Sequence, residues 1–280
     1  MKNSISAIGI DFGATNVRVG LVKNGEIKSL KKRKLPDDKS VDSIVSVMSD
    51  MIGEVDVEVK KVGIGVPSVV DSENGIVYDV QNIPGWEEVH LRQKLEESTG
   101  KEVFINNDAN CFALGEYYFG GGKGKGNLVG LVIGTGFAGG IIIDGKLYEG
   151  RNCGAGEFGM IPYKESILEH YASGSFFPRQ LGLIGEEVYE KALQGHHDSI
   201  EAFETLGSHI AEAVKMVLYT YDPDSIVLGG GISQTFDIFK DAFYKRLETY
   251  GFPNSLDHVD ISISKTENVA VLGAAALTAD

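Results

Sequence analysis

Apolar side chains recur at every second position in the first part of the chain. This alternation predicts strands at Ser6–Ile10 and Val17–Val22, and it resumes after Asn24-Gly25. An Asn-Gly pair favours the two positive φ angles of a type I′ turn. We therefore expect these strands to form an antiparallel meander.

The period then changes to that of a helix. Apolar residues take three- and four-residue spacing over Ser40–Ile52, whereas Val62–Val66 is the continuous apolar run of a buried strand. Val103–Asn106 predicts the next strand. We expect helices over residues 84–100 and Asp108–Phe119.

Residues 128–150, "LVGLVIGTGFAGGIIIDGKLYEG", repeat the opening design. An apolar strand, a turn of Gly and Thr and a second apolar strand lead to Asp144-Gly145, in the place that Asn24-Gly25 takes in the first unit. The later patterns predict a strand in "SIVLGGGIS" and helices at Gly185–Gln194, Ser199–Tyr221, Phe236–Tyr250 and the alanine-rich C-terminus. The sequence therefore predicts an α/β protein with two related lobes and a ligand-binding cleft between them.

We expect the N-terminal lobe to cover residues 1–109, joined by a C-terminal helix over 266–280. A larger C-terminal lobe would cover residues 110–265. No linker rich in Pro or Ser separates them, so a hinged pair is expected.

The net charge of the 280 residues is −14. A protein that grips nucleic acid needs a basic face, so we expect no nucleic-acid partner. The one basic run, Lys31–Lys34, is interpreted as a solvated loop.

Only two cysteines are present, Cys111 and Cys153, without a pairing or metal-binding pattern. The N-terminus has no signal-peptide pattern, and no apolar run is long enough to span a bilayer. These features predict a cytoplasmic protein without a membrane partner.

Three turns of small residues follow apolar strands. Backbone amides in such turns can converge on phosphate oxygens. The first turn includes a carboxylate, Asp11, which tolerates phosphate only with a cation such as Mg²⁺ between them. The candidate phosphate- and nucleotide-binding residues are Asp11, Gly13, Ala14, Thr15 and Asn16; Gly134, Thr135, Gly136, Phe137, Gly139 and Gly140; and Gly229, Gly230 and Gly231.

Asp108 stands where a strand ends and a helix begins. Its commonest task at such a place is to cap the helix, and spacing alone favours that reading. The alternative is a general base that takes the proton of an attacking hydroxyl, with Asn107 orienting a sugar.

Other polar residues suit sugar hydroxyls, because carboxylates and amides accept or share paired hydrogen bonds. Glu157 lies among glycines and Glu169 begins a short helix, where it could also serve the helix dipole. Trp86 could stack on a sugar ring or lie in the core. Gly65, Pro67 and Asn82 are candidates for the rim of a sugar site.

These motifs resemble those of the ROK family of sugar kinases and sugar-responsive repressors, over nearly the whole chain and in the family order. The motifs are "GIDFGATN", "GIGVPSVVD", "QNIPGW", "NNDANCFALGE", "VIGTGFAGGIIIDG", "GAGEFG", "LEHYASG" and "IVLGGGIS". The resemblance implies an actin-like ATPase (ribonuclease H-like) fold and phosphorylation of a hexose or hexose derivative with ATP and Mg²⁺.

The resemblance also implies site roles. Asp108 would be the base, with Asn107, Glu157 and Glu169 on sugar hydroxyls. The first two glycine turns would hold phosphates, with Asp11 reaching Mg²⁺ through ATP and water, and Gly229–Gly231 would lie near adenosine. A homodimer is implied only by the resemblance to this family.

The chain departs from the family pattern in two places. Met160 replaces a histidine that usually follows the Gly-Glu-x-Gly motif, and the cysteine cluster before "LEHYASG" is missing. Cys111 and Cys153 cannot rebuild a thiolate site, so we expect no structural zinc. Packing of Ile161, Tyr163 and Ile167 could hold the shortened loop instead.

The alternative function is a sugar- or nucleotide-binding regulatory protein of the same fold with little turnover. A repressor would carry a DNA-binding segment ahead of Asp11, for which we expect no room. Neither the sugar nor the choice of ATP over another phosphoryl donor follows from the sequence.

Overall fold

The computed structural model describes residues 5–80, 83, 85–151 and 153–279. Its first sheet has five strands in the order β3-β2-β1-β4-β8. Their bounds are β1 Ser6–Phe12, β2 Asn16–Lys23, β3 Glu26–Lys34, β4 Lys61–Val66 and β8 Glu102–Asn107. The first three strands are antiparallel, as the meander predicted, whereas β4 and β8 join in parallel.

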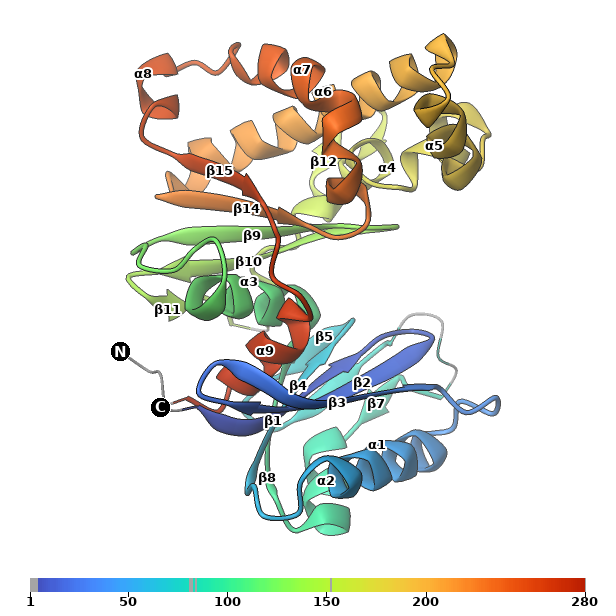
Figure 1. Cartoon of the computed structure of the whole chain (residues 1–280), viewed down its shortest axis with the longest axis vertical. Coiled ribbons are helices and arrows are strands. Elements are labelled where there is room, and N and C mark those ends of the chain that lie inside the picture. Colours follow the sequence, from blue (N-terminus) through green and yellow to red (C-terminus); the bar gives the residue numbers. More distant parts are fainter. Residues whose placement is uncertain (1–4, 81–82, 84, 152, 280) are drawn as a thin grey trace. The chain divides into compact units, whose positions relative to one another are not determined.

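Helices cover both faces of this sheet (Figure 1), and the strand sequence explains how. Ile8 and Ile10 of β1 belong to one buried cluster with side chains of helices α1 (Val41–Val55) and α2 (Leu91–Thr99). The residue between them, Gly9, faces α9 (Val269–Ala276): a Cβ there would lie 2.0 Å from the carbonyl oxygen of Val271. Alternation of glycine and isoleucine therefore lets one helix approach the backbone of the sheet closely.

The second large sheet has the order β11-β10-β9-β14-β15. Its strands are β9 Leu128–Ile133, β10 Phe137–Ile143, β11 Lys146–Leu147, β14 Ser225–Gly229 and β15 Asp260–Ile263. Taken in chain order, both sheets are arranged third-second-first-fourth-fifth. The two hairpin turns also match, with φ of 54° and 80° at Asn24-Gly25 and 50° and 73° at Asp144-Gly145. The structure thus confirms the internal repeat and its type I′ turns.

The remaining elements are short strands and helices. They are β5 Val69–Asp71, β6 Ile76–Tyr78, β7 Glu88–Val89, β12 Pro162–Tyr163, β13 Ser166–Ile167, α3 Asp108–Phe119, α4 Glu169–Ala172, α5 Gly185–Leu193, α6 His197–Tyr221, α7 Phe236–Leu247 and α8 Pro253–Leu256, with helical turns at Phe158–Met160, Phe177–Leu181 and Ile232–Thr235. Among the described residues, no helix combines the length and apolar character that a bilayer crossing requires.

The chain divides into two compact units. Unit 1 comprises Met1–Gly124, Gly140–Ala155 and Lys265–Asp280, and unit 2 comprises Lys125–Gly139 and Gly156–Ser264. This division differs from the expected boundary after residue 109, because α3 stays with unit 1. A Cβ on Gly273 of α9 would lie 1.6 Å from the carbonyl oxygen of Cys111 in α3, so these two helices are in backbone contact.

Three sequence predictions were wrong in detail. The helix expected over residues 84–100 is confined to α2, because Glu88–Val89 pairs with β6 as strand β7. Lys31–Lys34 belongs to the exposed edge strand β3 rather than to a loop, and lysines at such an edge discourage pairing with other chains. Gly139 and Gly140 lie inside β10, not in a turn.

Candidate active site

Asp11 is the partly buried residue between Ile10 and Phe12 of β1, and it faces Arg18 across the β1–β2 pair. The Asp11 side chain is 21% exposed, and its Oδ2 lies 3.4 Å from Nη1 of Arg18. Burial raises the pKa of Asp11, and the Arg18 charge opposes this shift. Arg18 was not predicted from the sequence, although it and Asp11 are equally distant from the turn of a predicted hairpin.

The turn after Asp11 is closed by its own backbone. The Gly13 amide donates to the Asn16 carbonyl oxygen at 3.0 Å, and the Thr15 carbonyl accepts from the Leu35 amide at 2.9 Å. Thr15 is exposed, whereas Gly13, Ala14 and Asn16 are half-buried. The φ of Gly13 lies outside the left-handed region.

Asn107, and not Asp108, caps helix α3. Its Oδ1 accepts from the amides of Ala109 at 2.8 Å and Asn110 at 3.4 Å, and its Nδ2 donates to the Ser68 carbonyl at 3.2 Å. Asp108 is the first residue of the helix and is half-buried, with Oδ1 2.8 Å from the Ala109 amide. The capping role that spacing alone favours for Asp108 is therefore wrong, because the residue before it is the N-cap.

A second polar group supports the start of α3. Asn106 Oδ1 accepts from the Asn107 amide at 2.8 Å and from Asn110 Nδ2 at 2.9 Å, while Asn106 Nδ2 donates to Glu149 Oε1. Glu149 Oε2 also accepts from the Ser72 hydroxyl at 2.8 Å. This network orients the Asn106 amide, and sequence reasoning could not find it because its members are far apart in the chain.

Three carboxylates of unit 1 lie near one buried thiol. The pKa of Cys111 is raised well above its usual value, first by burial and then by the negative charges of Asp108, Asp11 and Glu149. The predicted base and the predicted phosphate-turn carboxylate therefore lie in one neighbourhood of unit 1.

The other candidate residues of unit 1 lie in different surroundings. A Cβ on Gly65 would lie 3.0 Å from the Cys111 sulfur, so this glycine admits α3 against β4. Pro67 is half-buried after β4, and Asn82 lies outside the described residues. Trp86 is 1% exposed and its ring centroid lies 5.1 Å from that of Phe12. It is a core residue and not a surface for a sugar ring.

In unit 2, the turn Gly134–Gly136 is bound to the segment that carries Glu169. Glu169 Oε2 accepts from the Phe137 amide at 3.0 Å. The Ser173 hydroxyl donates to the Thr135 carbonyl at 2.8 Å, and the Gly174 amide donates to the Gly134 carbonyl at 2.7 Å. Ser173 was not singled out from the sequence, although it lies in the quoted "LEHYASG" motif.

Glu157 lies before the helical turn Phe158–Met160 and its side chain is exposed. Its pKa is raised, first by the loss of surrounding water and then by the negative charge of Glu169. The two predicted sugar carboxylates are therefore close enough to repel each other. Met160, which replaces the family histidine, is 60% exposed.

The glycines after β14 include one with a special backbone angle. Gly230 has a φ of 86°, and a Cβ there would lie 2.3 Å from the Ile133 carbonyl oxygen. Gly229 ends β14, and the space beside Gly231 is open. This turn thus stays next to the end of β9, where the Gly134 turn begins.

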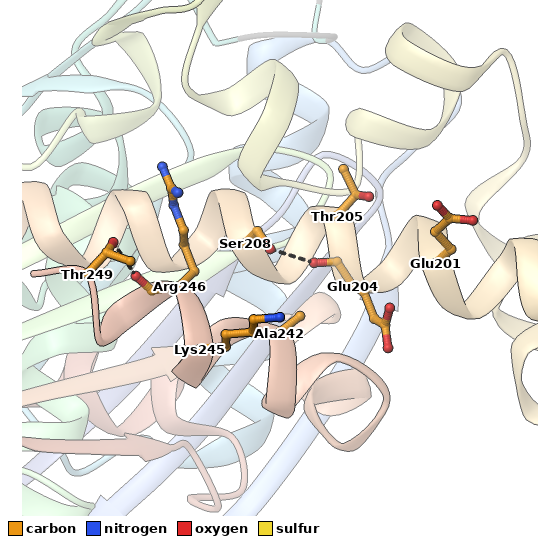
Figure 2. Close-up of a pocket in the computed structure, with 8 residues that line it drawn as sticks. All are labelled: Glu201, Glu204, Thr205, Ser208, Ala242, Lys245, Arg246 and Thr249. Carbon is orange, nitrogen blue, oxygen red and sulfur yellow. Dashed lines mark hydrogen bonds between the residues drawn. The ribbon is translucent and has the colours of Figure 1, made fainter.

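The structure also shows a groove of about 430 Å³ between α6 and α7 (Figure 2). Its lining residues are Glu201, Glu204, Thr205, Ser208, Ala242, Lys245, Arg246 and Thr249. None of them is a predicted site residue, so the groove is not the candidate active site.

Neither cysteine takes part in a cluster of metal ligands. Cys111 and Cys153 are both free and buried. Within the part of the chain that the structure describes, no three His, Cys, Asp or Glu side chains are grouped to hold a metal ion.

Comparisons with known proteins identify the family of the chain. The model of the ROK family matches residues 7–280. A glucokinase of Thermotoga maritima is 30% identical, with 98% of this chain and 97% of that protein covered. An N-acetyl-D-glucosamine kinase of Vibrio parahaemolyticus is 29% identical over 86% of this chain and 89% of its own length.

A solved structure of a ROK family glucokinase from Streptomyces griseus, in complex with glucose and AMPPNP, has a TM-score of 0.80 and 28% identity. The alignment covers 97% of this chain and 98% of that one. The actin-like ATPase fold expected from the motifs is therefore the fold of this chain. With its family model matched from residue 7 to the last residue, the chain belongs to the ROK family.

Proposed function

We propose that this protein is an ATP-dependent kinase of a hexose or hexose derivative. The observation that carries the proposal is that Asn107 and Asp108 have different roles at the start of α3. Because Asn107 caps the helix, the Asp108 carboxylate is not needed as the cap. A half-buried carboxylate at this place is suited to accept a proton from a substrate.

In this reaction the hydroxyl oxygen of the sugar forms a bond to the γ-phosphorus as the bond to the ADP oxygen breaks. Asp108 accepts the hydroxyl proton. The network of Asn106, Asn107 and Glu149 holds the first turn of α3, and with it Asp108, in position.

The donor set of unit 1 fits a nucleotide phosphate with its cation. Burial raises the pKa of Asp11, and Arg18 is the compensating charge beside it. A further cation would favour the ionised carboxylate. Mg²⁺ held through water by Asp11 would, when bound, neutralise phosphate charge. In unit 2, Gly134 and Gly231 both leave open space where a Cβ would stand, which would admit a ligand close to the backbone of that unit.

We assign Glu157 and Glu169 to the sugar hydroxyls. Loss of surrounding water, and then the negative charge of Glu169, raises the pKa of Glu157. Hydroxyl groups of a sugar that donate hydrogen bonds to these carboxylates would favour the ionised form. The backbone amide of Phe137 orients Glu169 for this task. The exposed Met160 cannot supply the hydrogen bonds of an imidazole.

The test is ADP release from ATP·Mg²⁺ against a panel of hexoses and N-acetylhexosamines. Turnover on one sugar should fall by about 10²–10⁴-fold in Asp108→Asn, without loss of folding. A variant that keeps full turnover would contradict the assignment of Asp108. Nucleotide binding without turnover on any sugar would instead favour a regulatory protein, and inorganic polyphosphate in place of ATP tests the phosphoryl donor.

A further inference from the structure

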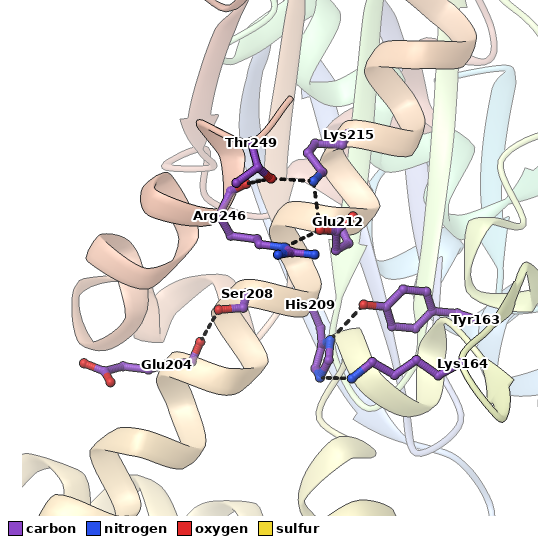
Figure 3. Close-up of polar contacts among 9 residues, drawn as sticks. All are labelled: Tyr163, Lys164, Glu204, Ser208, His209, Glu212, Lys215, Arg246 and Thr249. Carbon is purple, nitrogen blue, oxygen red and sulfur yellow. Dashed lines mark hydrogen bonds and ion pairs between the residues drawn. The ribbon is translucent and has the colours of Figure 1, made fainter. Parts of the chain in front are cut away.

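His209 of α6 is a buried side chain that the proposed reaction does not use, and it is 8% exposed. Its two ring nitrogens contact the hairpin β12–β13 (Figure 3). Nδ1 lies 3.0 Å from the Tyr163 hydroxyl, and Nε2 lies 3.4 Å from Nζ of Lys164. One side chain of a long helix therefore holds both a strand residue and the turn of the hairpin.

The chemistry of these partners selects one form of the imidazole. A lysine ammonium can only donate, so Nε2 must be the acceptor and Nδ1 must carry the proton. Nδ1–H then donates to the Tyr163 oxygen. Burial and the Lys164 charge lower the pKa of His209 to about 4, which keeps the ring neutral and this arrangement intact near neutral pH.

Aromatic rings enclose the same imidazole. The ring centroids of Tyr163, Tyr171 and Phe176 lie 5.6, 5.4 and 5.9 Å from that of His209, and Lys164 Nζ lies 5.2 Å from the centroid of Tyr171. Tyr171 and Phe176 follow the hairpin in the chain and flank Ser173. The packing therefore ties α6 to the whole segment 163–176.

This segment leads directly to the proposed sugar site. The Leu168 amide closes the hairpin on the Ile161 carbonyl at 2.9 Å, and Glu169 is the next residue. Glu169 accepts from the Phe137 amide at 3.0 Å. Contacts therefore run without a break from His209 through the hairpin to the carboxylate and the Gly134–Gly136 turn.

We propose that His209 is a positioning residue that clasps the β12–β13 hairpin and thereby sets the place of Glu169 for sugar binding. The inference rests on the proposed role of Glu169. In this proposal, the loop without cysteines is held by a neutral histidine that lies between a tyrosine and a lysine, inside an aromatic cluster.

The test compares His209→Phe, which keeps an aromatic ring and removes both nitrogens, with Tyr163→Phe, which removes only the hydroxyl. Val217→Ala is the matched control, because Val217 is a fully buried residue two turns further along α6. We expect His209→Phe to raise the sugar KM about tenfold or more while the ATP KM changes less than about twofold. Tyr163→Phe should have a smaller effect in the same direction.

Hydrogen exchange supplies a readout that does not depend on turnover. The amides of Leu168 and Phe137 should exchange faster in His209→Phe than in the wild type. In Val217→Ala, these two amides should exchange no faster than the change in global stability of that variant predicts. An unchanged sugar KM, or an equal change in Val217→Ala, would overturn the proposal. If the wild type turns over no sugar, the proposed function fails, and unchanged exchange at both amides would then refute the clasp itself.

Discussion

Asn107 and Asp108 are adjacent in the chain but have different tasks. The spacing could indicate only that one of them caps α3, and the hydrogen bonds of Asn107 Oδ1 decide which. The capping geometry depends on side-chain rotamers and on the anchor of Asn107 to Ser68. No pattern of residue types contains that information.

Asp11 carries a prediction about the metal. Asp11→Asn removes the charge while keeping the shape of the side chain, so half-maximal activity should require more Mg²⁺, by about tenfold. A titration of activity with Mg²⁺ at saturating ATP measures the shift. Thr15→Ser, which keeps a hydroxyl in the same exposed turn, should titrate as the wild type does. An unchanged titration in Asp11→Asn would remove Asp11 from the proposed cation site.

His209 carries a prediction about pH. Its pKa is lowered to about 4 by burial first, then by the charge of Lys164, with Glu212 opposing and Arg246 adding to the shift. The ordinary pKa near 6.5 applies to the unfolded chain, which therefore binds more protons between these values. The contribution of neutral His209 to the free energy of unfolding is complete above about pH 6.5. It is lost as the pH falls to about 4, a change of about 3 kcal/mol.

Urea unfolding at pH 5 and pH 7 checks this expectation. The wild type should lose more stability than His209→Phe over that interval, because the variant has no imidazole to protonate. Equal losses in the two proteins would show that His209 does not carry this part of the pH dependence.

Between helices, close approach depends on glycine and on paired charges. Helices α6 and α7 are linked by Glu212, which pairs with Arg246 and lies 2.8 Å from Lys215 Nζ; Lys215 in turn donates to Thr249 at 2.9 Å (Figure 3). Helices α3 and α9 instead meet backbone to backbone at Gly273. The helical pattern predicted that these helices exist, but not which pairs touch.

Gly273→Ala tests the contact of α9 with α3. The added Cβ would lie 1.6 Å from the Cys111 carbonyl oxygen, so the helices must separate, and the free energy of unfolding should fall by roughly 1–3 kcal/mol. Gly53→Ala is the matched control, because Gly53 lies in α1 with nothing within 4 Å of the added Cβ. That change should be neutral or stabilising by up to about 1 kcal/mol. Equal effects in urea denaturation would contradict the close contact.

For the molecule as a whole, the missing cysteine cluster makes a prediction about metal removal. If the histidine clasp replaces a metal in holding the loop, a chelator should leave the Tm of the ligand-free protein unchanged. A structural zinc contributes so strongly to folding that its removal would be evident in the melting curve. A marked fall in Tm with chelator, together with zinc in the purified protein, would contradict this expectation.

The sequence alone determined much of this protein, because alternation and helical spacing are local properties. It predicted the two antiparallel hairpins with their type I′ turns, the helix beginning at Asp108, the internal repeat and the family. These features depend on residues that are neighbours in the chain, where backbone preference and periodic burial act directly.

Only the tertiary structure decided which residues meet across long separations. The pairing of Glu169 with Phe137, of Asn106 with Glu149 and of His209 with Tyr163 joins residues 32, 43 and 46 positions apart. The burial of Trp86 and the strand β7 before α2 were also decided there. The reason is physical: a contact between distant residues is set by the packing of whole elements, and packing overrides the local preferences from which a sequence is read.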